Sequence, residues 1–155
     1  MTNFIKLTIS LLITFTAAGI GSAATTPAIP SWYQSLNKPA FTPPSWLFGP
    51  AWTILYILTA VAFYLIWTKT NFETHKTAFI VFFAQLILNA LWSIIFFGLK
   101  QPFFALIEIA VLWTAILFTL IKFYQVNKTA GLLLVPYLLW VTFATALNFA
   151  IWQLN

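Results

Sequence analysis

The sequence predicts an all-α membrane protein in which five transmembrane helices form a single domain over residues 1–155. The first observation is composition: 62% of the residues are hydrophobic and only 6% are charged. A soluble domain usually has about a quarter charged residues, so lipid is the solvent that fits this chain. The second observation is five apolar runs, each near the roughly 20 residues that a helix needs to cross the hydrocarbon core. They lie near Phe4–Thr26, Trp46–Thr68, Ala78–Leu99, Pro102–Gln125 and Thr129–Trp152.

Each run is continuously apolar, which favours helices over a β-barrel, where residues alternate over segments of about ten. The first run has a second interpretation. Lys6, the apolar stretch after it and the small residues Gly21-Ser22-Ala23 are also typical of a signal peptide with a cleavage site. We favour a retained helix, because the apolar run continues past Ala23 and its loss would remove one wall of a small bundle.

The charges predict the orientation. All seven basic residues are lysines, and they are scattered singly, so the net charge of +5 does not indicate a nucleic-acid partner. The N-terminus and the second and fourth connections carry most of them: Lys6, Lys69, Lys76, Lys122 and Lys128. The opposite side carries Lys38 and Lys100. Because excess lysine marks the cytoplasmic face, we expect a cytoplasmic N-terminus.

The one long connection, residues 27–45, contains five prolines together with Trp32, Tyr33 and Phe41. Proline resists helix formation and favours extended backbone, and a mere linker would not need aromatic side chains. We interpret the segment as an ordered lid over the mouth of the bundle, with Pro43 in it. For Trp32 and Tyr33 taken alone, an interfacial aromatic belt explains the pattern equally well.

Polar and aromatic residues share one face on three of the helices, because their spacing is three or four residues. The stripes are Trp52, Tyr56 and Thr59; Gln85, Asn89, Trp92 and Phe96; and Trp140, Ala144 and Asn148. Amides inside a membrane often only link helices by hydrogen bonds, and this is the favoured interpretation for Gln85 alone. For the whole set we predict a pocket, since large aromatic side chains hold helices apart and their faces stack on flat π-systems.

Other chemistry finds little support. The chain has no cysteine and a single histidine in a short connection, so we expect no metal site, no ligated haem and no resident cofactor. Glu108 is the only acid inside a span and is a functional candidate by default, although a solvated position near the interface is an equal alternative. Pro136 should bend the fifth helix, either to widen a cavity or as a feature of packing.

At this point the residues resemble a known family, the TspO/MBR or tryptophan-rich sensory proteins, whose animal members are called translocator protein or peripheral benzodiazepine receptor. The resemblance covers essentially the whole chain. It is carried by Trp32-Tyr33, Leu36, Lys38-Pro39, Pro43-Pro44, Trp46, Phe48-Gly49-Pro50, Trp52, Leu55-Tyr56, Gln85-Leu86, Leu88-Asn89, Trp92, Phe96-Phe97-Gly98, Tyr124-Gln125-Val126, Pro136-Tyr137, Trp140, Phe143 and Leu147-Asn148.

The resemblance implies a homodimer in a membrane and a pocket under the first loop, for protoporphyrin IX and other tetrapyrroles, benzodiazepine-type drugs and, in animals, cholesterol. It places Trp52, Asn89, Trp92, Trp140, Ala144 and Asn148 in that pocket, and Trp32, Tyr33 and Pro43 in its lid. If the protein promotes light- and oxygen-dependent breakdown of porphyrin, the resemblance makes Trp52 and Trp140 the expected participants.

One departure affects the expected ligand. Where the animal proteins carry tyrosine and then arginine in a cholesterol-recognition pattern, this chain has Phe149 and Gln153. Such patterns are weak guides, but the difference favours a tetrapyrrole over a sterol, and a bacterial cell membrane as the location. We therefore expect a tetrapyrrole-binding sensor, with a passive carrier of porphyrins or sterols as the alternative. Coupled transport is disfavoured, because the chain has no internal repeat and one intramembrane charge.

Overall fold

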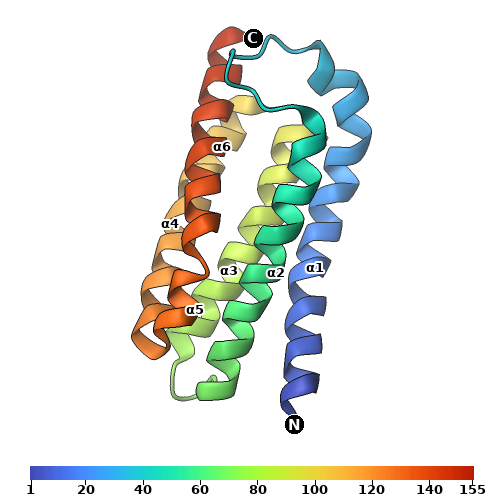
Figure 1. Cartoon of the computed structure of the whole chain (residues 1–155). Helices are drawn as coiled ribbons and strands as arrows, with labels where there is room; N and C mark the ends of the chain where they lie inside the picture. The colour runs from blue at the N-terminus through green and yellow to red at the C-terminus, as the bar shows by residue number, and fades with distance from the viewer.

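The computed structural model describes residues 1–155 and contains five helices long and apolar enough to cross a membrane, which confirms the all-α bundle (Figure 1). α1 packs against α2 and α3, α3 against α4, and α4 against α6. The elements are α1 (Asn3–Ala28) continued by the π-helical η1 (Ile29–Tyr33), α2 (Ser45–Lys69), α3 (Lys76–Ser93) continued by η2 (Ile94–Gly98), α4 (Pro102–Val126), and α5 (Lys128–Leu132) followed by α6 (Val135–Leu154).

The first helix is longer than the sequence predicts, and the connection after it is correspondingly shorter. Pro27 lies inside α1 and Pro30 inside η1, so only residues 36–44 are without helix. Each proline removes one N–H from the helix, but a π turn changes the pairing around Pro30. The Ser31 hydroxyl also donates to the carbonyl of Pro27 at 2.9 Å. The expectation of extended backbone from residue 27 onward is therefore corrected.

Pro136 does more than bend the fifth helix. α5 ends at Leu132, a turn follows, and α6 begins at Val135 with Pro136 in its first turn, where the missing N–H costs nothing. The Asn127 side chain caps α5 by accepting hydrogen bonds from the backbone N–H groups of Thr129 and Ala130.

Gly131 allows α5 to approach α4 closely. A Cβ atom at this position would lie 2.5 Å from the Cβ of Tyr124 and 2.7 Å from its Cα. Because part of this obstacle is backbone, Gly131→Ala should lower the free energy of unfolding by about 1–3 kcal/mol, as overpacking does. Thermal unfolding in detergent measures the change. Gly19→Ala is the matched control, because a Cβ there meets no atom within 4 Å and alanine is about 1 kcal/mol better than glycine in a helix. Equal melting temperatures for the two variants would contradict the steric explanation.

Stacked aromatic side chains fill one end of the bundle. The rings of Phe63 and Phe82 are parallel with their centroids 4.2 Å apart, and Phe123 stacks on Phe82 at 5.6 Å. Ile66 and Ile116 are fully buried in the same cluster. These residues belong to the half of α2, α3 and α4 near the second and fourth connections (Figure 1). The close packing of this half leaves the other half, under residues 36–44, for a cavity.

Candidate ligand-binding site

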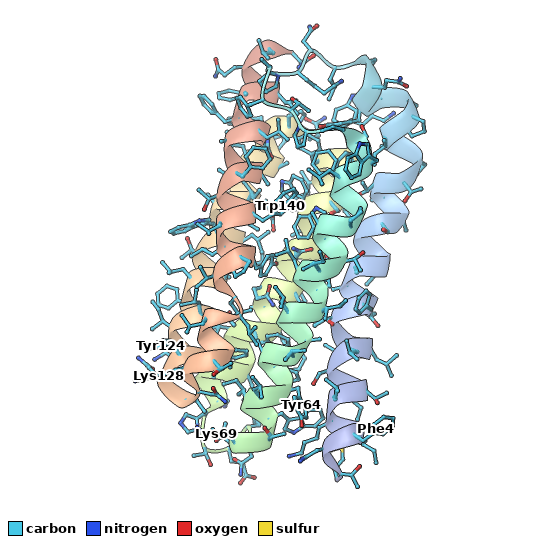
Figure 2. All side chains as sticks on the ribbon, in the orientation of Figure 1. Phe4, Tyr64, Lys69, Tyr124, Lys128 and Trp140 are labelled. Carbon is cyan, nitrogen blue, oxygen red and sulfur yellow. The ribbon has the colours of Figure 1, made fainter.

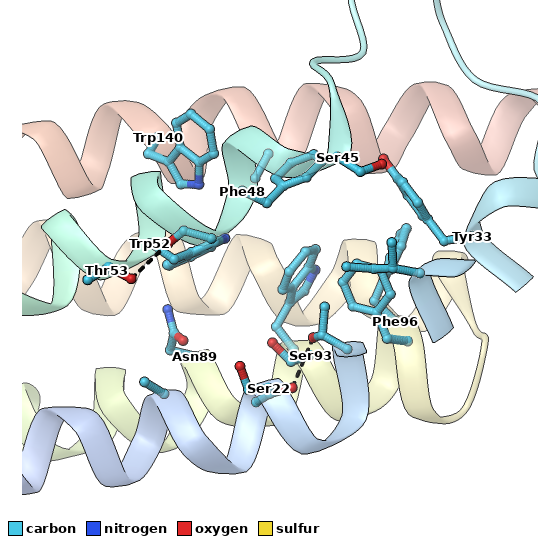
Figure 3. Close-up of a pocket in the computed structure, with 18 of the residues that line it drawn as sticks. Ser22, Tyr33, Ser45, Phe48, Trp52, Thr53, Asn89, Ser93, Phe96 and Trp140 are labelled. Atoms are coloured by element: carbon cyan, nitrogen blue, oxygen red, sulfur yellow. Dashed lines mark hydrogen bonds between the residues drawn. The ribbon is translucent and has the colours of Figure 1, made fainter. Parts of the chain in front are cut away.

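A cavity of about 610 Å³ lies within the bundle, enclosed by α1, η1, α2, α3, η2 and α6 (Figure 3). Its volume falls in the range of about 300–1,000 Å³ that is usual for small-molecule sites. Most lining residues are hydrophobic: Phe15, Ala18, Gly19, Gly21, Ser22, Thr25, Ile29, Tyr33, Ser45, Trp46, Phe48, Gly49, Trp52, Thr53, Tyr56, Asn89, Trp92, Ser93, Phe96, Phe97, Trp140, Phe143, Ala144, Leu147, Asn148 and Ile151.

The structure brings most of the sequence-predicted site residues to this one cavity. Tyr33, Trp52, Tyr56, Asn89, Trp92, Phe96, Trp140, Ala144 and Asn148 line it. The stripes on the second, third and fifth spans therefore face a common space instead of the surrounding lipid.

Trp32 and Pro43 do not line the cavity, and their place in a lid over the mouth of the bundle stays a prediction. For Trp32, helix continues through this segment, and its ring packs against Phe96 with ring centroids 5.6 Å apart. Tyr33 takes the inner position and packs against Phe48 and Phe97. Its hydroxyl is buried without a hydrogen-bond partner, so the cavity has one donor to offer at this end.

A chain of three polar side chains lies deeper in the bundle and joins α2, α3 and α6. The Tyr56 hydroxyl donates to Oδ1 of Asn89, and Nδ2 of Asn89 donates to the hydroxyl oxygen of Tyr137 at 2.7 Å. Asn89 and Tyr137 are almost fully buried. A satisfied network of this kind fixes side-chain positions in a low-dielectric interior, so Tyr56 and Asn89 present a preorganised polar surface to the cavity.

A second polar contact fixes the indole of Trp92. Its Nε1 donates to Oδ1 of Asn148 at 3.1 Å, and Nδ2 of Asn148 donates to the carbonyl of Pro102 at 2.8 Å. Asn148 thus links α3, α4 and α6 and is only 1% exposed. The Trp92 ring also stacks on Phe96, with centroids 5.3 Å apart, so its π-face has a defined orientation at the cavity wall.

Aromatic side chains bridge α2 and α6, whose backbones hardly contact each other. Trp52 and Trp140 meet at nearly a right angle with centroids 6.4 Å apart, and Phe48 meets Trp140 in the same way at 6.3 Å. Figure 3 shows these three rings on the same side of the cavity. Edge-to-face pairs of this kind are favourable, and they hold the two helices at a distance that leaves room between them.

The wall supplied by α1 was not predicted from the sequence. Phe15, Ala18, Gly19, Gly21 and Ser22 all line the cavity. A group of small residues on one helical face carries the signal, but the same Gly21 and Ser22 are also typical of a cleavage site. Their small size lets α1 stand beside the cavity without filling it, and Gly21 packs directly on Ser93 of α3.

Two buried polar residues lie outside the site. Gln85 is 1% exposed and its amide has no hydrogen-bond partner, so the structure does not show the helix-linking role expected of it. Glu108 is 7% exposed, which rules out the solvated position near the interface, and neither carboxyl oxygen has a partner. It does not line the cavity. No group of three or more His, Cys, Asp or Glu side chains is placed to hold a metal ion.

Comparison with known proteins agrees with this architecture. The family model described as the TspO/MBR family matches residues 9–153. The chain is similar to the tryptophan-rich protein TspO of Archaeoglobus fulgidus, with 46% identity over 99% of both chains. It is 42% identical to the tryptophan-rich sensory protein of Cereibacter sphaeroides, over 94% of this chain and 92% of that one. Identity to the human translocator protein is 38%, over 80% of this chain and 75% of that one. With its five membrane-length helices and this match over nearly its whole length, the chain is an integral membrane protein of the TspO/MBR family.

Proposed function

We propose that this protein is a membrane receptor or sensor that binds a flat, largely apolar ligand of the tetrapyrrole class, such as protoporphyrin IX, in the cavity of the bundle. The observation that carries the proposal is that the Trp52 and Trp140 indoles line the same cavity as the buried amides of Asn89 and Asn148. Indole faces stack on extended π-systems, and a small number of fixed polar groups sets the orientation. Benzodiazepine-type molecules share the flat aromatic character and belong to the same expected class.

A direct binding comparison tests the proposal. We expect protoporphyrin IX to quench the tryptophan fluorescence of the purified protein in a saturable way, because four indoles line the cavity, whereas a sterol should not compete for the site. Trp140→Phe should reduce the amplitude of quenching. Trp113→Phe is the matched control, since Trp113 is a partly buried tryptophan that donates to Thr142 and does not line the cavity. Equal loss of quenching in both variants would contradict the assignment, and so would displacement of protoporphyrin IX by the sterol.

Light- and oxygen-dependent porphyrin breakdown is a second candidate, favoured by the edge contact of Trp52 with Trp140 at the place where a ring would stack. In this reaction dioxygen is the oxidant. An indole would donate an electron to the excited porphyrin, which passes it to dioxygen as superoxide; the oxidised indole then takes an electron back from the porphyrin, and superoxide adds to the resulting porphyrin cation. Under equal illumination, the Trp52→Phe variant should give less product than the wild type per bound porphyrin. Equal yields would mean that the protein only concentrates a substrate that sensitises its own oxidation.

The proposal includes an orientation and an assembly state. Phe4, Lys69 and Lys128 lie at the end of the bundle opposite the C-terminus (Figure 2), and this lysine-rich end is the expected cytoplasmic face. We place the protein in a bacterial cell membrane as a homodimer with the N-terminus inside. Passive movement of porphyrins or sterols by the same protein remains the alternative function, and it depends on how the cavity is reached.

A further inference from the structure

The exposed residues of the cavity lining all come from two helices. These helices are α1 and α2, and their exposed lining residues form the rim of the cavity: Phe15, Gly19, Ser22, Ser45, Trp46, Gly49 and Thr53. Every lining residue on α3, η2 and α6 is buried or only partly exposed. The cavity therefore opens between α1 and α2, on the side of the bundle.

The rim is suited to lipid. None of its residues carries a charge, and Trp46, one of its members, is 72% exposed. Gly19 and Gly49 face open space, since a Cβ atom on either would meet nothing within 4 Å. Phe15 to Gly19 occupy the middle of the first membrane-length helix, so this part of the opening lies at the depth of the acyl chains. Thr53 satisfies its own hydroxyl by donating to the carbonyl of Gly49 at 2.8 Å.

Contacts outside the cavity lining hold together the end of the bundle near the first loop. No residue of the 36–44 loop lines the cavity, and the loop is tied to the C-terminus. The Asn37 N–H donates to Oδ1 of Asn155 at 3.0 Å, while Nδ2 of Asn155 donates to the carbonyl of Asn37 at 2.9 Å. The ammonium group of Lys38 donates to the carbonyls of Tyr33, Gln34 and Leu36. The paired hydrogen bonds of Asn37 and Asn155 form a latch between the loop and the C-terminus, at the end of the bundle that would face water.

The opposite end of the same seam is also held together. The ammonium group of Lys6 on α1 donates to the carbonyl of Trp67 on α2 at 2.8 Å and lies 6.0 Å from the centre of the Trp67 ring. Ala60 of α2 and Thr14 of α1 are fully buried. α1 and α2 are therefore joined on the side of the packed core and separate only beside the cavity.

We propose that the gap bounded by Gly19, Ser22, Gly49 and Thr53 is a lateral portal through which a ligand dissolved in the bilayer enters the cavity. The inference rests on the proposed binding function and extends it: the ligand is one that partitions into the membrane first, with its flat face along the acyl chains. The portal admits such a molecule without opening the latch, and the same route returns it to the lipid.

The test uses the full-length protein in lipid nanodiscs, with protoporphyrin IX added through donor vesicles. Gly19→Phe and Gly49→Phe place a ring in the portal, and we expect both the association rate and the dissociation rate to fall by about tenfold or more, because the ring raises the barrier to passage. Ile20→Phe and Ile54→Phe are the matched controls, since both positions are exposed on the same helices and neither lines the cavity. They should leave both rates unchanged.

A second readout does not depend on porphyrin binding. The chain has no cysteine, so Ala144→Cys introduces one thiol inside the cavity, and an apolar maleimide dissolved in the lipid measures access to it. Labelling should be slowed by Gly19→Phe and unaffected by Asn155→Ala, which releases the latch. Faster labelling in Asn155→Ala, with no effect of Gly19→Phe, would overturn the portal. If labelling follows the portal variants while the wild type fails to bind protoporphyrin, the portal stands and the proposed ligand is wrong.

Discussion

Replacing Trp52 and Trp140 together with leucine should weaken protoporphyrin binding by about ten- to a hundredfold. Leucine keeps the wall apolar but removes two π-faces, and aromatic contacts add about 0.5–1.5 kcal/mol each beyond the burial of area. A loss of about 1.4 kcal/mol is a tenfold change in Kd. Equilibrium titration of the purified double variant measures the effect, and each single variant should lose part of it.

The control for this experiment is Trp113→Leu. Trp113 has a hydrogen-bonded indole on α4 and lies outside the cavity lining, so its replacement should leave Kd unchanged. Since Trp52 and Trp140 also hold α2 and α6 apart, the thermal stability of every variant is compared with that of the wild type. Wild-type affinity in a folded double variant would mean that the ligand does not stack on this wall.

Asn89→Leu should lower both the stability of the bundle and its affinity for the ligand. Asn89 accepts a hydrogen bond from the Tyr56 hydroxyl and donates one to the Tyr137 hydroxyl. Leucine at this position therefore leaves two hydroxyl groups in the bundle without these partners. An unsatisfied buried polar group costs about 1–3 kcal/mol, although measured hydrogen bonds between membrane helices average nearer 0.6 kcal/mol. We expect a loss of about 1–3 kcal/mol in total, measured by thermal unfolding, together with weaker ligand binding.

Gln85→Leu is the matched control, because Gln85 lies one turn earlier on the same helix and is equally buried, yet its amide has no partner. Removing it should leave stability unchanged or raise it, since it relieves an unsatisfied polar group. If the two variants lose stability equally, the loss comes from replacing a buried amide, and the hydrogen bonds of Asn89 with Tyr56 and Tyr137 do not stabilise the bundle. A loss of stability in Gln85→Leu alone would contradict the hydrogen-bond assignment.

The pattern of the sequence predicted the stripes on three helices because membrane helices repeat every three to four residues and polar groups in lipid turn inward. Trp52, Asn89 and Trp140 are far apart in the chain, yet each belongs to a stripe of polar, aromatic or small residues spaced three or four positions apart on its own helix. The stripe pattern alone did not separate Asn89 from Gln85. Both are buried amides on one face of α3, and only the arrangement of Tyr56 and Tyr137 shows which one is bonded.

The first helix shows the same limit. Small residues carry little periodic signal, because they are equally suited to helix contacts, a cleavage site or the edge of a cavity. The π-helical η1 contains both Trp32 and Tyr33, and only the structure shows that Tyr33 lines the cavity while Trp32 does not.

By itself the sequence determined the solvent of this protein, the number of its spans and the faces that carry indoles and amides, since all three follow from local composition and the period of the helix. Only the tertiary structure decided where the cavity opens, which amides are bonded and how the loop is latched to the C-terminus. Those features depend on contacts between residues distant in the chain, such as Asn37 with Asn155, and no local pattern encodes them.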